Sequence, residues 1–194
     1  MKKIISILVS VTLLVACGGK TITINGDLSE FDKVAPDSKV ELYIDGSDEA
    51  LATTTLDANK NFTADIAVDG EQFVMLLIND TPVMELVTEG KDIAFSYNPE
   101  TYTVDYAEEC LNASLRDIKN SISDQMNALY TCTDDAEAEA LYAELCNYID
   151  RAVVENKDNI TSLKILQYYM YYGEDEARFA ELFEMINTKY ADQP

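Results

Sequence analysis

Residues 101–118 read TYTVDYAEECLNASLRDI, and the spacing of apolar side chains changes inside this stretch. As far as Asp105, β-forming residues alternate with polar ones, as they do in a half-buried strand. From Leu111 onward, apolar residues recur every three or four positions, which is the spacing of an amphipathic helix. We therefore predict a β domain at 21–105 and a helical domain at 106–194, which together form an α+β fold.

The β domain contains eight short runs of β-forming residues, separated by turn-forming pairs such as Asp69-Gly70. In the run KVELYID, Val40, Leu42 and Ile44 share one side of the strand. The run FVMLLIN is apolar throughout, which suits a strand covered on both faces. Many short strands at this spacing favour an antiparallel β-sandwich or barrel-like domain. The runs are TITING, KVELYID, ALATTTL, NFTADIAV, FVMLLIN, VMELVTE, DIAFSY and TYTVDY.

The helical domain is predicted to hold about four helices. Asp134, followed three residues later by Glu137, resembles a capping box. Asn159 is placed to cap a third helix, and acids at 174–176 precede a fourth. Each domain has about ninety residues, which is small for an independent core. We therefore expect the two domains to pack against each other.

The chain begins with a basic pair and a short apolar run, which are typical of a secretory signal. This run is shorter than the ~20 apolar residues that a membrane-spanning helix needs. It ends in LVAC at 14–17, which resembles the lipobox of bacterial lipoproteins. The resemblance implies a signal peptide at 1–16, a diacylglyceryl group on the sulfur of Cys17, and a lipidated tether at 17–20. The alternative is ordinary secretion, which favours a small residue where Leu14 stands.

No acidic residue occurs between Cys17 and Asp27. In the lipoproteins that the lipobox resembles, an aspartate next to the cysteine retains proteins at the inner membrane, and an acid-rich run marks export to the cell surface. We therefore expect attachment to the bilayer through acylated Cys17, at the outer membrane and facing the periplasm.

Charge and composition exclude several classes of function. The chain has 36 acidic and 14 basic side chains, a net charge of −22, and no histidine. Binding of nucleic acid needs basic residues that displace counterions, so we expect no nucleic-acid partner. Without histidine there is no Ser-His-Asp or Cys-His catalysis, and no C-x-x-C occurs. Paired carboxylates can hydrolyse glycosides, but chance pairs are inevitable among so many acids. We expect a non-enzymatic binding or scaffold module with no catalytic residue, metal site or cofactor.

The segment LQYYMYYG at 166–173 is unusually rich in tyrosine. Tyr168 and Tyr171 are candidates for a partner-binding surface, because aromatic side chains supply a large contact area. The favoured alternative places Tyr169 and Tyr172 toward the core and lays Tyr168 and Tyr171 along a seam between helices.

Two further features favour structural roles. Cys110, Cys132 and Cys146 are interpreted as packing residues, because acids precede Cys110 and a helical hairpin would keep Cys132 away from Cys146. The segment DANKNF at 57–62 has alternating oxygen side chains, as a calcium loop does. It lacks the glycine and the later acid that such a loop needs, so a hairpin turn is favoured.

Several segments resemble an uncharacterised domain known mainly from the N-termini of lipoproteins in one group of Gram-negative bacteria. They are TITINGDL, KVELYI, ATTTLDANKNFTADIAV, MELVTEGKDIAFSYNPETYTV, CLNASLRDI and NKDNITSLKILQYYM. In many members of that family a thioredoxin-like domain of the peroxiredoxin and disulfide-reductase type follows, and its redox cysteines have no counterpart here. The resemblance implies a second hypothesis, in which this chain is the targeting or accessory half of a thiol-disulfide system with a separate thioredoxin-like partner.

Overall fold

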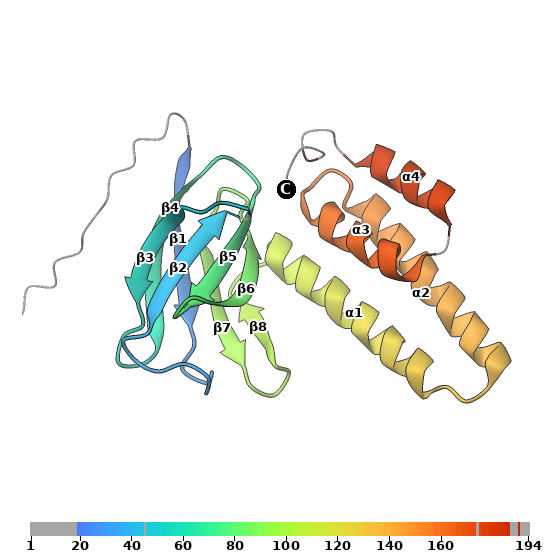
Figure 1. The fold of residues 1–194 in the computed structure, drawn as a ribbon, viewed down its shortest axis with the longest axis horizontal. Coiled ribbons are helices and arrows are strands. Elements are labelled where there is room, and N and C mark those ends of the chain that lie inside the picture. The colour runs from blue at the N-terminus through green and yellow to red at the C-terminus, as the bar shows by residue number, and fades with distance from the viewer. Residues whose placement is uncertain (1–18, 45, 174, 187–189, 191–194) are drawn as a thin grey trace, which may run out of the picture.

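Eight strands precede four helices in the computed structural model, which describes residues 19–44, 46–173, 175–186 and 190 (Figure 1). The predicted α+β fold and each of the predicted strand runs are confirmed. The predicted signal peptide, Cys17 and Glu174 lie outside the described residues. The strands are β1 (Lys20–Asp27), β2 (Lys39–Ile44), β3 (Ala50–Thr55), β4 (Asn61–Val68), β5 (Phe73–Ile78), β6 (Thr81–Val87), β7 (Ile93–Asn98) and β8 (Thr103–Tyr106). The helices are α1 (Leu111–Thr131), α2 (Asp135–Glu155), α3 (Thr161–Tyr172) and α4 (Glu176–Met185).

The strands form two four-stranded sheets, with the orders β4-β1-β7-β8 and β3-β2-β5-β6. Pairing between the described strands is antiparallel except for β1 and β7, which run parallel. The sequence analysis expected antiparallel pairing throughout. The difference arises at the short link 88–92, which joins the end of β6 in one sheet to the start of β7 in the other. The link stays at one end of the sandwich, which is also the end at which β1 starts. Strand β7 therefore starts toward the end at which β1 starts.

Both sheets contribute to one hydrophobic core. Ile24 of β1, Leu42 of β2, Ile66 of β4 and Leu76 of β5 belong to the same cluster, and each is at most 1% exposed. The alternation of apolar and polar residues seen in the sequence places these side chains on the inner faces. Their removal from water, at ~25 cal/mol per Å² of apolar surface, is the main force that holds the sheets together.

The four helices form a second core, and α2 and α4 begin at the predicted capping box and within the predicted acidic run. The Asp134 carboxylate accepts a hydrogen bond of 2.9 Å from the backbone N–H of Glu137 at the start of α2. The Asp175 carboxylate accepts one of 3.0 Å from the N–H of Arg178 at the start of α4. Asn159 stands one residue before the N-cap of α3, and its side chain accepts from the N–H of Thr161.

The two domains pack against each other, as predicted, through a set of residues that we name the closed junction: Glu71, Phe73, Val87, Asn112, Ile160 and Tyr190. Phe73 and Val87 are residues of the β domain, but their side chains pack in the hydrophobic core of the helical domain. Asn112, at the start of α1, uses its side-chain oxygen and nitrogen to pair with the N–H and C=O of Val87, both at 2.7 Å. It thereby provides partners for the backbone N–H and C=O of Val87 at the β6 edge.

The carboxylate of Glu71 ties the helical domain to the β domain at a second point. It accepts hydrogen bonds from the backbone N–H of Ile160, at 2.8 Å, and from the hydroxyl of Tyr190. Tyr190 is 2% exposed and belongs to the helical core. An acid of the β domain therefore caps α3, whose partial positive end favours it.

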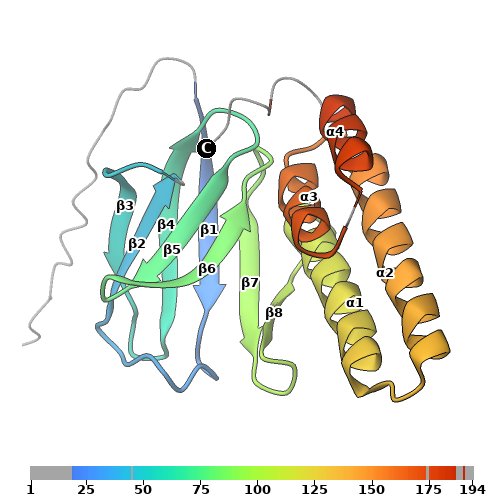
Figure 2. The ribbon, with the colours of Figure 1, turned by 45° about the vertical axis from the view of Figure 1, so that its right-hand side comes forward.

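The prediction that FVMLLIN is covered on both faces holds only at Phe73. There the outward side chain packs into the helical core, while Val74, Leu76 and Ile78 pack into the β core. Met75 and Leu77 remain half-exposed, so the prediction is wrong at these positions. The helices contact the β6 edge and the Phe73 end of the sheet β3-β2-β5-β6, and the β8 edge of the other sheet. They leave the rest of the outer face of the sheet β3-β2-β5-β6 uncovered (Figure 2).

Candidate functional site

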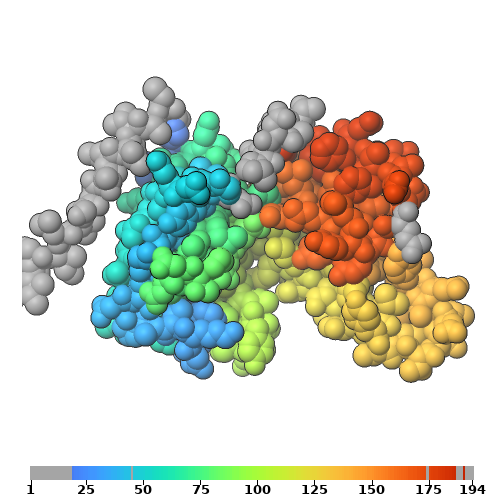
Figure 3. Space-filling model, in the orientation of Figure 1, coloured from blue at the N-terminus to red at the C-terminus, as the bar shows by residue number. Residues whose placement is uncertain are grey.

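Two adjoining hollows lie between the β domain and the helices, and we name them together the interdomain cleft. The first has a volume of about 440 Å³ and lies between the edges of the two sheets and α1. The second, of about 310 Å³, lies between β6, α1 and α3. Glu85 and Lys119 line both hollows. Figure 3 shows the molecule notched between the β7–β8 hairpin and α1.

The cleft exists because the two sheets are left open on one side. Strands β3 and β4 lie in contact on the closed side, whereas β6 and β8 are edge strands on the other. The start of α1 fills part of this opening through Asn112 and Leu115. Farther along, α1 diverges from the β7–β8 hairpin, and the first hollow lies between them (Figures 1 and 3).

The first hollow has an apolar floor and aromatic walls. Leu28 and Leu115 are nearly completely buried beneath it. The rings of Phe31 and Tyr97 stand 4.7 Å apart between centroids. Burial raises the pKa of Tyr106 above the ordinary value of a tyrosine, so its phenol stays neutral at physiological pH. Charged and polar side chains stand among these apolar and aromatic ones, and such a combination is typical of sites for small molecules.

Lys119 is the unusual side chain of the cleft. It is half-buried, and it makes no hydrogen bond or ion pair with the residues that the structure describes. Burial lowers the pKa of its ammonium, the nearby Glu85 carboxylate partly opposes this, and Lys164 adds to the lowering. A charge held in this way costs stability, because it has lost part of its contact with water without gaining a partner.

The charges next to Lys119 are already matched. Lys164 forms an ion pair with Glu85 at 2.8 Å, and both side chains are less than one-fifth exposed. The Lys164 ammonium also lies 4.7 Å from the centroid of the Phe73 ring. Together, Lys119, Lys164 and Glu85 carry one net positive charge in a protein whose total is −22. The site is therefore short of one negative charge.

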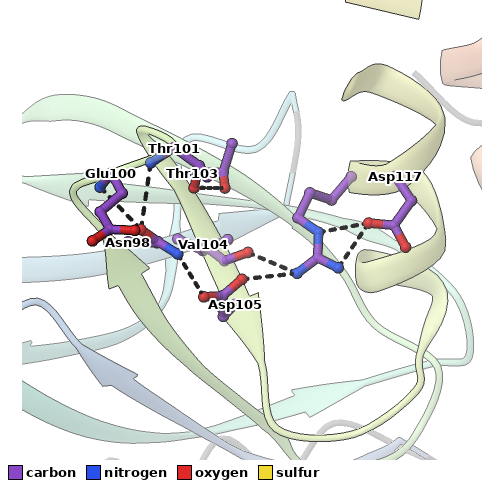
Figure 4. A network of polar contacts seen from close by, with 8 residues as sticks. Asn98, Glu100, Thr101, Thr103, Val104, Asp105 and Asp117 are labelled. Atoms are coloured by element: carbon purple, nitrogen blue, oxygen red, sulfur yellow. Dashed lines mark hydrogen bonds and ion pairs between the residues drawn. The ribbon is translucent and has the colours of Figure 1, made fainter. Parts of the chain in front are cut away.

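The hairpin that forms one wall is fixed to α1 by Arg116. Its guanidinium donates to the carbonyl of Val104 at 3.1 Å, to the Asp105 carboxylate at 3.3 Å and to the Asp117 carboxylate at 2.8 Å. Asn98 holds the turn by donating to Asp105 at 2.9 Å and accepting from backbone N–H groups beyond it (Figure 4). This network fixes the wall before any ligand arrives.

Tyr102 projects from this fixed hairpin at the rim of the first hollow. Its side chain is 82% exposed, and its backbone has φ of +56°, in the left-handed region that non-glycine residues rarely adopt. A large aromatic side chain held in strained backbone and turned to solvent is typical of a residue kept for contact rather than for folding.

The two tyrosines selected from the sequence both line the second hollow with Lys119. Tyr168 is half-buried, and burial raises the pKa of its phenol. Tyr171 is 82% exposed, so the interpretation that it lies along a helix–helix seam is wrong. Tyr169 is 6% exposed and packs in the helical core as expected. Within one turn of α3, Tyr169 therefore faces the helical core, while Tyr168 and Tyr171 face the cleft.

Sequence reasoning missed Lys119, Tyr102 and the positioning residues Asn112 and Arg116. A signal for two of them was present. The buried positions of α1 are Asn112, Leu115, Ile122 and Met126, and half-buried Lys119 lies between them, one heptad after Asn112. The apolar spacing from Leu111 onward leaves both polar residues among the expected surface positions.

The remaining candidates have structural surroundings. The thiols of Cys132 and Cys146 donate to backbone carbonyls, and Cys110 and Cys132 are free. The Asp57 carboxylate accepts from the N–H groups of Asn59 and Asn61, which makes 57–62 a turn. This turn joins strands of different sheets, so the expected hairpin is wrong. Within the described ranges, no group of three or more His, Cys, Asp or Glu residues is placed to hold a metal ion.

Comparison of the chain with protein-family models, curated proteins and solved structures finds no match. The likeness to the lipoprotein domain therefore stays a prediction. Among the residues described, no helix has both the length and the apolar character required to cross a membrane.

Proposed function

We propose that the chain is a lipid-anchored, non-catalytic binding module on the periplasmic side of the outer membrane, with the interdomain cleft as its binding site for a small molecule. The observation that carries this proposal is Lys119, which stands half-buried and without a partner among the described residues where two aromatic-lined hollows meet. Residues that lower stability while fitting no structural need are typical of functional sites.

The position of β1 gives the proposed anchor an orientation. Strand β1 begins at Lys20, three residues after Cys17, and such a tether spans ~10 Å at most. Acyl chains on Cys17 would hold this end of the β domain close to the bilayer. Because β1 and β7 are parallel, the turn that carries Tyr102 lies at the opposite end of the same sheet. The first hollow would then open away from the membrane.

The second hypothesis, an accessory role beside a thioredoxin-like protein, has less support. Cys110 and Cys132 stand at the two ends of the 21-residue helix α1, ~30 Å apart at 1.5 Å per residue. These two thiols therefore do not form a dithiol pair in this fold. The hypothesis rests on the family resemblance alone.

Photocross-linking in intact cells tests the binding function. A benzophenone amino acid replaces Tyr102 in the full chain, and a matched variant carries it at Tyr130, which is 75% exposed and outside the cleft. We expect a small-molecule adduct at position 102 that is absent at position 130. A thioredoxin-like protein captured at position 102 would favour the second hypothesis, and equal labelling at both positions would overturn the cleft as the site.

Fractionation tests the anchor separately. Cys17→Ala should release the chain from the membrane fraction, while Cys110→Ala, which removes a thiol of the described part, should leave it bound. A Cys17→Ala protein that stays with membranes after washing in high salt would contradict the lipid attachment.

A further inference from the structure

We propose that the interdomain cleft binds a small amphipathic anion with a single negative charge. The apolar chain or ring of this ligand occupies the first hollow, and its anionic head group contacts the ε-ammonium of Lys119. The inference rests on the proposed binding function and adds the chemical class of the ligand to it.

The charge of the ligand follows from what the half-buried cations of the cleft already contact, since Lys33, which also lines the first hollow, is exposed to water. Arg116 is matched by Asp105 and Asp117, and Lys164 by Glu85. Lys119 alone among these three has no such partner, so a neutral ligand would leave its charge uncompensated. A second negative charge on the ligand would face Glu85, which is close enough to affect Lys119. One negative charge completes the site.

The apolar part of the ligand follows from the lining of the first hollow. Besides Lys119, its lining includes Leu28, Phe31, Met84 and Leu115, and its volume of about 440 Å³ suits a small molecule. Elsewhere the acidic surface of the chain repels anions, because its net charge is −22. A simple inorganic anion gains nothing from the apolar walls, whereas an amphipathic anion uses both parts of the cleft.

A matched pair of fluorescent probes separates the two contributions. Anilinonaphthalene sulfonate is an aromatic anion, and phenylnaphthylamine is its neutral parent without the sulfonate. Both are titrated into the folded full chain, its Lys119→Met variant and its Lys157→Met variant. Lys157 is exposed and lies outside the cleft, so its substitution removes the same charge from elsewhere.

We expect the unmodified chain to bind the sulfonate at least tenfold more tightly than the neutral parent. Lys119→Met should reduce the sulfonate affinity at least tenfold and leave the affinity for the neutral parent within twofold. Lys157→Met should change neither. Decanoate should displace the sulfonate from the unmodified chain, whereas decanol at the same concentration should not.

Each contrary result overturns a defined part of the account. Equal binding of both probes to the unmodified chain would refute the anionic ligand and leave the cleft as a binding site. Equal effects of Lys119→Met and Lys157→Met would refute the role of Lys119. If neither probe binds, the ligand class is wrong, while the cross-linking at Tyr102 still decides the binding function on its own.

Discussion

The closed junction and the interdomain cleft join the same two domains, yet they differ in how completely their polar groups are satisfied. At the closed junction Asn112 is 4% exposed and both of its side-chain hydrogen bonds go to Val87, while the Glu71 carboxylate serves Ile160 and Tyr190. In the cleft, Lys119 has no partner among the described residues. The strained backbone of Tyr102 and the unmatched charge of Lys119 therefore both lie in the interdomain cleft. Because the cleft is already open, a ligand can reach them without separation of the two domains.

The largest effect is expected at the closed junction. Asn112→Ala removes two buried hydrogen bonds and leaves the N–H and C=O of Val87 without partners. It should lower the free energy of unfolding by ~2–4 kcal/mol, measured by urea denaturation. Asn127→Ala, at an exposed position of the same helix, serves as the control and should cost less than ~0.5 kcal/mol. Equal losses would show that Asn112 does not join the domains.

The next effect concerns Glu71 and Tyr190. Glu71→Ala should destabilise the protein by ~1–3 kcal/mol, because the N–H of Ile160 and the hydroxyl of Tyr190 lose their shared acceptor. A double-mutant cycle with Tyr190→Phe measures the coupling, which we expect to be ~1 kcal/mol. Additive losses from the two substitutions would contradict a direct contact between these side chains.

Lys119→Met should have the opposite sign. Burial lowers the pKa of Lys119 in the folded state below its usual value of 10.5, so its charged form opposes folding. This cost is fully present below the folded-state pKa and disappears as pH rises toward 10.5. We expect the variant to be more stable at neutral pH by ~0.5–1 kcal/mol, or ~2 °C in melting temperature. A loss of stability would indicate a structural role for Lys119.

The smallest effect is expected at Tyr102. Tyr102→Gly relieves a left-handed backbone that glycine adopts freely, so unfolding free energy should change by less than ~1 kcal/mol in either direction. Affinity for the sulfonate probe should nevertheless fall severalfold, because the variant loses an aromatic wall. Tyr130→Gly, near the end of α1, serves as the control: it should cost ~0.5 kcal/mol and leave probe affinity unchanged. The reverse pattern would place the ligand elsewhere.

The fold was largely predictable from the sequence, because strand alternation and helical spacing are local signals. The strand runs, the caps at Asp134 and Asp175, and the buried Tyr169 all follow from such signals. The parallel pairing of β1 and β7 could not be predicted in this way, because it depends on where the link 88–92 enters the second sheet. The turn at Asp57 was wrongly predicted to close a hairpin. The residues of a turn do not indicate whether the next strand pairs with the preceding one or enters the other sheet, as β4 does.

The candidate site was only partly predictable. Tyr168 and Tyr171 were selected from an unusual local composition, and the structure places both beside the cleft. Lys119 meets them only because α1 and α3, which are distant in sequence, pack together, and Glu85 comes from β6 of the β domain. The heptad spacing of Asn112 and Lys119 was present in the sequence, but a lysine on a helix is usually interpreted as solvent-exposed. A polar interruption of an apolar stripe is the pattern that would have identified it.

Titration of the Lys119 ammonium by lysine side-chain NMR tests the central claim most directly, with and without decanoate and with exposed Lys157 as the internal reference. The account predicts that the pKa of Lys119 lies below 10.5 in the free protein and rises when decanoate binds, because the carboxylate stabilises the ammonium. A pKa of Lys119 that is not below 10.5 in the free protein, or that does not respond to saturating decanoate, would contradict this account.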